Sequence, residues 1–443
     1  MFENIIDQGA VLQLRDDIIN NRNAPSMLFF GQPDLGKSSA ALELARVLSC
    51  ENDAAWKCTC SSCENHRYLQ HDDLLVLGNR SFSAEINACY NAYLRNPSNA
   101  GVKHLFFRSL RKLLLRFSPV LMEDDPKLSK ISSVLQAFDE KLGEFWVSSQ
   151  NCDNETLKKI CDSLIKDALT LENDGIGNII PIGQIRKASY WCRLAPCGKN
   201  KTLIIENAQD MREEGRNSLL KLLEEPPVSV NIVLTSQRRE AIIPTILSRL
   251  RPYRFLKRNE ESEKEVIRRV FQDTVNEKLL KSGSSLVSAY LNSFMPQKTD
   301  VLYPLAAWFI VSLMRIVSVS MKKKGIKTIP QIVTSLGMRY APIAEEAGFE
   351  PSIKGIFIVK TLVSKSGNFD NDCFSHFIKI CLELVNDVTR LANDPQGIMC
   401  NKIFSKHADE AVTAVEILNI NAASALEKFY FNLKKDLIRG LYG

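Results

Sequence analysis

The sequence lacks the features of an exported or membrane-spanning protein. Its first residues, Met1-Phe2-Glu3-Asn4, are polar and acidic, whereas a secretory signal opens with positive charge and a hydrophobic run. The most apolar stretch, Leu305 to Met314, is too short to cross a bilayer and is closed by Arg315, so it predicts a buried helix. We therefore expect a cytoplasmic protein with no membrane partner.

The chain also has little excess of either charge. Its 57 Lys and Arg against 51 Asp and Glu give a net charge of +6 over 443 residues, which is compatible with nucleic acid but is no evidence for it. With 45% apolar and 24% charged residues, it has the composition of a soluble globular protein. Its length predicts about three domains.

Cysteine is plentiful, but a reducing compartment argues against a disulfide framework for the twelve thiols. Four of them fall close together, at Cys50, Cys58, Cys60 and Cys63. Such a cluster can hold a tetrahedral Zn²⁺, and with all four positions filled by protein the site would be structural. No thioredoxin-like C-x-x-C precedes a βαβ helix, which disfavours a redox centre. Unrelated thiols are the alternative.

The clearest motif is a phosphate loop at residues 31–38, GQPDLGKS, which matches G-x-x-x-x-G-K-[ST] between an apolar strand-like run and a predicted helix. The glycines let backbone N–H groups point at phosphate oxygens, and the helix N-terminus favours an anion. Lys37 would reach the β- and γ-phosphates, and the Ser38 hydroxyl would hold Mg²⁺. The predicted nucleotide-binding residues here are Gly31, Gly36, Lys37, Ser38 and Ser39. Only Asp34 is unfavourable, because its carboxylate repels phosphate.

A second part of a nucleotide site is predicted at the end of the strand Lys201–Ile205. Carboxylates at this place would support Mg²⁺ and polarise water, but the chain has Glu206-Asn207. Glu206 can sit near a metal and is included among the cofactor-binding residues, whereas Asn207 cannot act as a general base.

Residues 79–173 contain helical patterns and no strand pattern. One helix is basic and amphipathic, and its cations are Lys103, Arg108, Arg111, Lys112 and Arg116. It could bind a phosphate backbone or an acidic partner, although a solvated helix face is the favoured interpretation.

Several motifs together resemble bacterial clamp-loader subunits of DNA polymerase III, which are AAA+ proteins. Beside the phosphate loop and the cysteine cluster that follows it, the resemblance rests on HDDLLVL (71–77), IGQIRKAS (182–189), NSLLKLLEEPP (217–227) and PTILSR (244–249). It covers about residues 1–78 and 178–256. A weaker similarity to the family's last collar segment begins at Leu418-Asn419-Ile420-Asn421, and the stretch 79–173 has no counterpart.

The resemblance implies a fold and a role. Residues 1–256 are expected to form an α/β AAA+ domain with a parallel sheet, a zinc-binding insertion at 50–63 and a helical insertion at 79–173. A helical lid (257–297) and an all-α collar (298–443) would follow. Asp34, Asn207 and a lid without the arginine of active relatives favour the delta-prime type over the ATP-hydrolysing gamma/tau type.

A subunit of the delta-prime type is expected to bind ATP and Mg²⁺ weakly. By resemblance, Arg249 would act as an arginine finger in a neighbouring subunit's site, with a surface salt bridge as the alternative. The implied partners are gamma/tau and delta subunits in a heteropentamer, and through them the sliding clamp and primed DNA. The chain would thus bind DNA, and be part of a nucleotidyltransferase, only through its association with the DNA polymerase III holoenzyme. A P-loop phosphotransferase is a remote alternative, supported by the phosphate loop alone.

Overall fold

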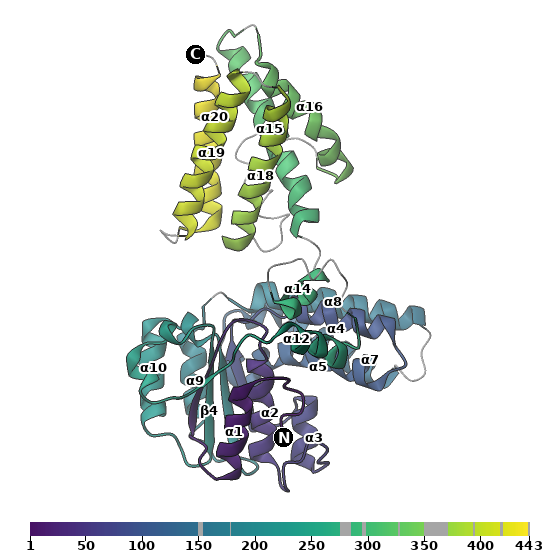
Figure 1. Cartoon of the computed structure of the whole chain (residues 1–443), viewed down its shortest axis with the longest axis vertical. Helices are drawn as coiled ribbons and strands as arrows, with labels where there is room; N and C mark the ends of the chain where they lie inside the picture. Colours follow the sequence, from purple (N-terminus) through teal and green to yellow (C-terminus); the bar gives the residue numbers. More distant parts are fainter. Residues whose placement is uncertain are drawn as a thin grey trace. The chain divides into compact units, whose positions relative to one another are not determined.

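The computed structural model of the 443-residue chain describes residues 1–148, 154–177, 179–274, 285–294, 298–326, 328–349, 371–392, 395–416 and 420–441. The chain divides into two compact units, Met1–Met295 and Pro296–Gly443 (Figure 1). Parts of the predicted lid, and residues 418–419 of the collar segment, lie outside the described residues.

A parallel five-stranded sheet forms the centre of the first unit, with the strand order β2-β3-β4-β1-β5. The strands are β1 (Ser26–Phe30), β2 (Leu74–Gly78), β3 (Lys201–Glu206), β4 (Val230–Ser236) and β5 (Arg251–Arg254). Every residue of β3 and β4 is buried, as expected for near-continuous apolar runs in a parallel sheet that is covered on both faces.

Alternate side chains of each strand enter different cores. Met27 and Phe29 pack with α1 (Gly9–Ile19), α2 (Lys37–Ser49) and α3 (Ser61–Tyr68). Leu28 points to the other face, towards α6 (Pro119–Met122), α9 (Ile182–Trp191), α10 (Glu213–Glu224) and α11 (Pro244–Leu247). Figure 1 shows α9 and α10 on one side of β4 and α1 and α2 on the other. The short helices η2 (Ala208–Asp210) and η3 (Arg239–Ala241) connect these elements. The predicted α/β fold with a parallel sheet is therefore confirmed.

The insertion between β2 and α9 is helical in its described part and has a core of its own. Its elements are α4 (Ser83–Arg95), α5 (Ala100–Leu114), η1 (Leu115–Phe117), α6, α7 (Leu128–Ser148) and α8 (Asn154–Gly175). The same core includes residues of α12 (Glu260–Val270) and α14 (Leu286–Ser293), which belong to the segment predicted as a lid. Arg95 of α4 reinforces this packing through an ion pair with Asp273 at 2.9 Å. The insertion and the lid helices thus form one helical layer.

The second unit is helical throughout its described residues. It contains α15 (Lys298–Lys323), α16 (Gln331–Glu346), α18 (Asn371–Ala392), α19 (Pro395–Glu416) and α20 (Ala422–Gly440). Residues Leu302–Lys323 are long and apolar enough to cross a membrane, but 72% of the most apolar window is buried inside the protein. Phe309 is fully buried there, with Phe377 and Phe429 around its ring. Leu305 to Met314 is therefore the buried helix that the sequence predicts.

Gly78 ends β2 in a conformation that only glycine adopts without strain. Its φ is +138°, and a Cβ atom would lie 2.4 Å from the carbonyl oxygen of Glu206 on β3. We predict that Gly78→Ala lowers the free energy of unfolding by about 1–3 kcal/mol or more. Gly143, exposed within α7 with no atom within 4 Å of such a Cβ, is the matched control. Gly143→Ala should instead raise stability by about 0.5–1 kcal/mol. Urea denaturation measures both, and equal effects would contradict this account.

Candidate functional site

The phosphate loop has the backbone that its sequence predicts. It leaves β1 at Gly31 and enters α2 at Lys37, and Gly36 at the helix N-cap has a φ of +91°. Gly31 is equally constrained, because a Cβ there would lie 2.3 Å from the carbonyl oxygen of Phe255. The structure thus brings Gly31, Gly36, Lys37, Ser38 and Ser39 together at the start of one helix, where free N–H groups favour an anion.

Lys37 lies over this loop without an acidic hydrogen-bond partner. Its Nζ donates to the carbonyl oxygens of Gly31, at 2.6 Å, and Gln32. Burial lowers the pKa of Lys37 to about 8; nearby Asp34 opposes this shift, whereas Arg80 adds to it. The side chain is therefore mostly protonated at neutral pH and can attract a phosphate group. Asp34 itself is exposed and has a φ of +59°, a left-handed conformation that Asp tolerates.

The carboxylate that ends β3 is held by arginine. Glu206 is 4% exposed, and Arg116 of η1 donates to its Oε2 from Nη2. Arg80, which follows β2, places its Nη1 3.9 Å from Glu206 Oε1 and also pairs with Glu85. Burial and the charge of Arg80 lower the pKa of Arg116 to about 9, so Arg116 remains charged at neutral pH.

These residues do not fit the Mg²⁺ site that the sequence predicts beside Glu206. Magnesium needs oxygen ligands, but the Glu206 carboxylate already faces two guanidinium groups. Asn207 has no carboxylate, and its backbone N–H donates to Thr235 Oγ1 at 3.2 Å. Asp210, the next acid along the chain, accepts a hydrogen bond from Asn79 at 2.9 Å. The predicted role of Glu206 near a metal is thus opposed by its observed partners.

The basic helix of the insertion presents no cationic surface. Each of its five cations has a partner within the protein. Lys103 donates to the carbonyl oxygen of Trp146, and Arg108 donates to that of His66. The other three form ion pairs, Arg111 with Asp139, Lys112 with Glu85 and Arg116 with Glu206. None of the five side chains is exposed, so the favoured prediction of a solvated helix face was wrong. The alternative, a contact with a phosphate backbone or an acidic partner, stays a prediction. Arg80 and Arg116 are the residues that sequence reasoning missed at the site. For Arg80, its position shortly after the strand β2 is the one signal in the sequence that could have indicated a role at the site.

Arg249 follows α11 directly after its C-cap residue, Ser248, and connects two of the sequence motifs. Its Nη2 is 2.5 Å from Glu224 Oε1, in the LLEEPP segment that ends α10, and its Nη1 donates to the carbonyl oxygen of Thr245. The side chain is 31% exposed. The surface salt bridge considered as an alternative role therefore exists in the isolated chain, and the guanidinium still reaches solvent.

The four clustered cysteines converge as the sequence predicts. The sulfur atoms of Cys50, Cys58, Cys60 and Cys63 all lie within 4.8 Å of one another, at the end of α2 and the start of α3. Hydrogen bonding to the backbone N–H of Cys60 lowers the pKa of Cys58 to about 7, whereas burial raises the pKa of Cys63. Arg46 donates to the Cys63 sulfur at 3.0 Å. A set of four thiolates that closes a tetrahedron suits Zn²⁺.

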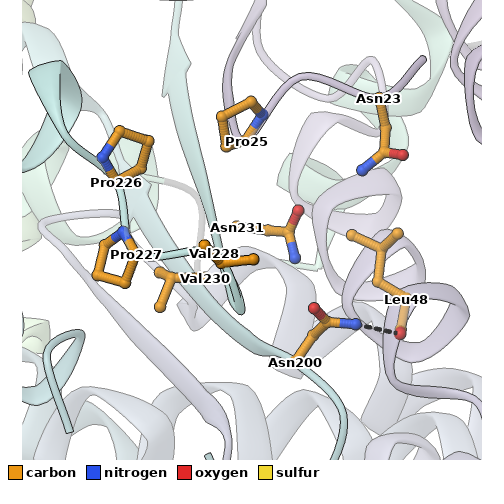
Figure 2. Close-up of a pocket in the computed structure, with 9 residues that line it drawn as sticks. All are labelled: Asn23, Pro25, Leu48, Asn200, Pro226, Pro227, Val228, Val230 and Asn231. Atoms are coloured by element: carbon orange, nitrogen blue, oxygen red, sulfur yellow. Dashed lines mark hydrogen bonds between the residues drawn. The ribbon is translucent and has the colours of Figure 1, made fainter. Parts of the chain in front are cut away.

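A cavity of about 420 Å³ lies where the strands β1, β3 and β4 begin (Figure 2). Its lining consists of Asn23, Pro25, Leu48, Asn200, Pro226, Pro227, Val228, Val230 and Asn231. Asn200 is fixed by a hydrogen bond to the carbonyl oxygen of Leu48 at 2.9 Å. No lining residue carries a charge, and the phosphate loop lies at the other ends of the strands, so this cavity is separate from the candidate nucleotide site.

Comparison with known proteins identifies the family. A family model described as "DNA polymerase III, delta subunit" matches residues 6–99 and 130–259, just over half of the chain. Among solved structures, a DNA polymerase III gamma subunit-related protein from Thermotoga maritima is similar, at 17% identity and a TM-score of 0.26 over 58% of this chain and 80% of that one. That TM-score is too low to support an inference. No curated protein matches the sequence.

The matched ranges contain the phosphate loop, the cysteine cluster, Glu206 and Arg249, whereas residues 100–129, which include α5 and Arg116, lie between them. The extent of the family match, together with the parallel sheet that carries the phosphate loop, shows that this chain belongs to the DNA polymerase III delta subunit family and is an AAA+ protein of the clamp-loader type.

Proposed function

We propose that this chain is a delta-prime-type subunit of the DNA polymerase III clamp loader, which hydrolyses no ATP itself and supplies Arg249 to a neighbouring subunit. In the cytoplasm it would join gamma/tau and delta subunits and help to place the sliding clamp on primed DNA. The helices after residue 298 would form the collar that joins the subunits. The observation that carries the proposal is the pairing of Glu206 with Arg116, because it removes the acid that a hydrolytic site needs.

The chemistry of the remaining residues supports a site without turnover. Hydrolysis requires a base or an orienting group for the attacking water, and Asn207 has no carboxylate to offer. The phosphate loop itself is intact, which favours nucleotide binding and keeps the gamma/tau-type motor as the second candidate. A P-loop phosphotransferase has only that loop in its support.

The surroundings of Arg249 support a role between subunits. A finger must be partly exposed and held in place before its partner arrives, and Glu224 and the carbonyl of Thr245 hold this guanidinium while it remains 31% exposed. Its Nε atom is buried without a hydrogen-bond partner among the described residues. An incoming phosphate would gain a charged donor at little cost, because an exposed salt bridge contributes only about 0–1 kcal/mol.

We predict that Arg249→Ala leaves the chain folded and able to assemble. ATP hydrolysis at the adjacent site of the reconstituted complex should fall by about 10³-fold or more, because arginine fingers contribute on that scale. Arg249→Lys should restore little, since a point charge cannot reproduce the planar fork of guanidinium. Steady-state ATPase of the complex with primed DNA and clamp is the measurement.

Glu224→Gln is the matched control for this test. It removes the same salt bridge and leaves the guanidinium in place. If Arg249 acts on a neighbour, the complex with Glu224→Gln should keep most of its ATPase activity. If the two variants lose activity equally, or if Arg249→Ala loses none, Arg249 has only a structural role and the proposed function fails.

We predict negligible ATP turnover by the purified chain alone. The reason is the occupied carboxylate of Glu206 and the absence of a general base at Asn207. Phosphate release is measured with and without DNA, and Lys37→Ala identifies any contaminating activity. Turnover by the wild-type chain that Lys37→Ala abolishes would favour the motor subunit instead.

We predict about one Zn²⁺ per chain, held by Cys50, Cys58, Cys60 and Cys63. Because such a metal stabilises the segment that it closes, Cys60→Ser should lower the melting temperature as well as the zinc content. Cys197→Ser, at an exposed thiol outside the cluster, is the matched control and should change neither. Elemental analysis of protein purified without chelators gives the metal content. A metal-free protein of full stability would contradict the assignment.

A further inference from the structure

Arg116, which pairs with Glu206 at the end of β3, has N–H donors that no acceptor satisfies among the described residues. The residue is only 5% exposed, and its Nη2 is used by Glu206. Its Nε and Nη1 atoms are buried and have no hydrogen-bond partner in the described part of the chain. Buried charged donors are normally satisfied, so two nitrogen atoms of one guanidinium without a partner indicate a site for an acceptor.

Three cations, Lys37, Arg80 and Arg116, lie around the phosphate loop and the end of β3, together with the acids Asp34, Glu85 and Glu206. Arg80 follows β2 and places its Nη1 3.9 Å from Glu206 Oε1, and its charge also lowers the pKa of Lys37 in the phosphate loop. Both arginines stack on the ring of Phe82, at 4.8 Å and 5.2 Å from its centre, so their positions are fixed. Arg80 shares Glu85 with Lys112. Glu206 is the most deeply buried of the described acids that face these cations, since Glu85 is 20% exposed and Asp34 is exposed.

We propose that this cluster binds the polyphosphate group of a nucleotide without a divalent cation, with Arg80 and Arg116 supplying the positive charge that Mg²⁺ supplies elsewhere. Arginine suits this task because it stays protonated and presents planar N–H donors to phosphate oxygens. A divalent cation at Glu206 would instead meet the two guanidinium groups that already face this carboxylate. The choice of a nucleotide as the ligand is the one part of this inference that rests on the proposed function.

Arg116 belongs to the part of the insertion that the family model leaves unmatched. It lies in η1, within the residues 100–129 that the family model does not match. The insertion, which has no assigned role, would therefore complete the phosphate site of the domain that carries it.

The test measures binding of ATP and of inorganic pyrophosphate to the full chain by calorimetry, once in EDTA and once in excess Mg²⁺. The proposal predicts that both ligands bind in EDTA, and that ATP binds there no more than about twofold more weakly than with Mg²⁺. Pyrophosphate separates recognition of the polyphosphate from recognition of the base and sugar.

Three variants sharpen the test. Arg116→Met removes the charge and all the N–H donors of the side chain at similar volume. It should weaken binding in EDTA by about tenfold or more while making binding Mg²⁺-dependent. Arg111→Met, a neighbouring arginine of α5 that pairs with Asp139, is the matched control and should bind as wild type does. Glu206→Gln preserves packing and should tighten binding in EDTA, because it removes the negative charge among the cations.

The proposal is overturned if wild-type binding of ATP weakens more than twofold when Mg²⁺ is removed, if neither ligand binds in EDTA, or if Glu206→Gln weakens binding. The Glu206→Gln result also keeps the test decisive if Arg116→Met does not fold. These outcomes are independent of the ATPase of the assembled complex, so the failure of this inference and the failure of the proposed function can be told apart.

Discussion

The buried ion pair between Arg116 and Glu206 is the interaction on which the interpretation of this subunit depends. It joins the helical insertion to the end of a central strand, and both side chains are almost completely buried. Removing one member of such a pair leaves an unpaired buried charge, which costs about 3–5 kcal/mol. The pair is therefore a fixed part of the domain. It neutralises the carboxylate that would otherwise attract a metal ion, and it brings a permanent cation to the same place.

This arrangement separates two properties that usually occur together in a phosphate-loop protein. The loop has glycines at both ends and Lys37 above it, and this backbone geometry allows it to bind an anion. The end of β3, with Arg116 on Glu206 and an amide at Asn207, lacks the groups for hydrolysis. Under the proposed function, such a subunit would contribute to a neighbour's reaction through Arg249 while its own site remains unreactive.

The sequence predicted those features that local patterns encode. The phosphate loop and the buried strands follow from glycine spacing and short apolar runs, and the four thiols near residue 50 converge as their spacing suggested. The site partners of Glu206 could not be predicted in this way, because Arg80 and Arg116 reach it from segments about 126 and 90 residues away, with nothing in the local pattern to join them. The basic helix was misinterpreted for the same reason. Its charges look like a solvated face until Asp139, Glu85 and Glu206 are placed opposite them by the fold.

The most direct test of the central claim is to locate a divalent cation in crystals of this chain. Mn²⁺ can replace Mg²⁺ and is identified by its anomalous scattering, so crystals grown with ATP and excess Mn²⁺ would show where the metal binds. The account predicts no anomalous peak within coordination distance of Glu206, and density for the Arg116 guanidinium still on that carboxylate. A Mn²⁺ ion bound to Glu206 and to the nucleotide, with Arg116 displaced, would contradict it.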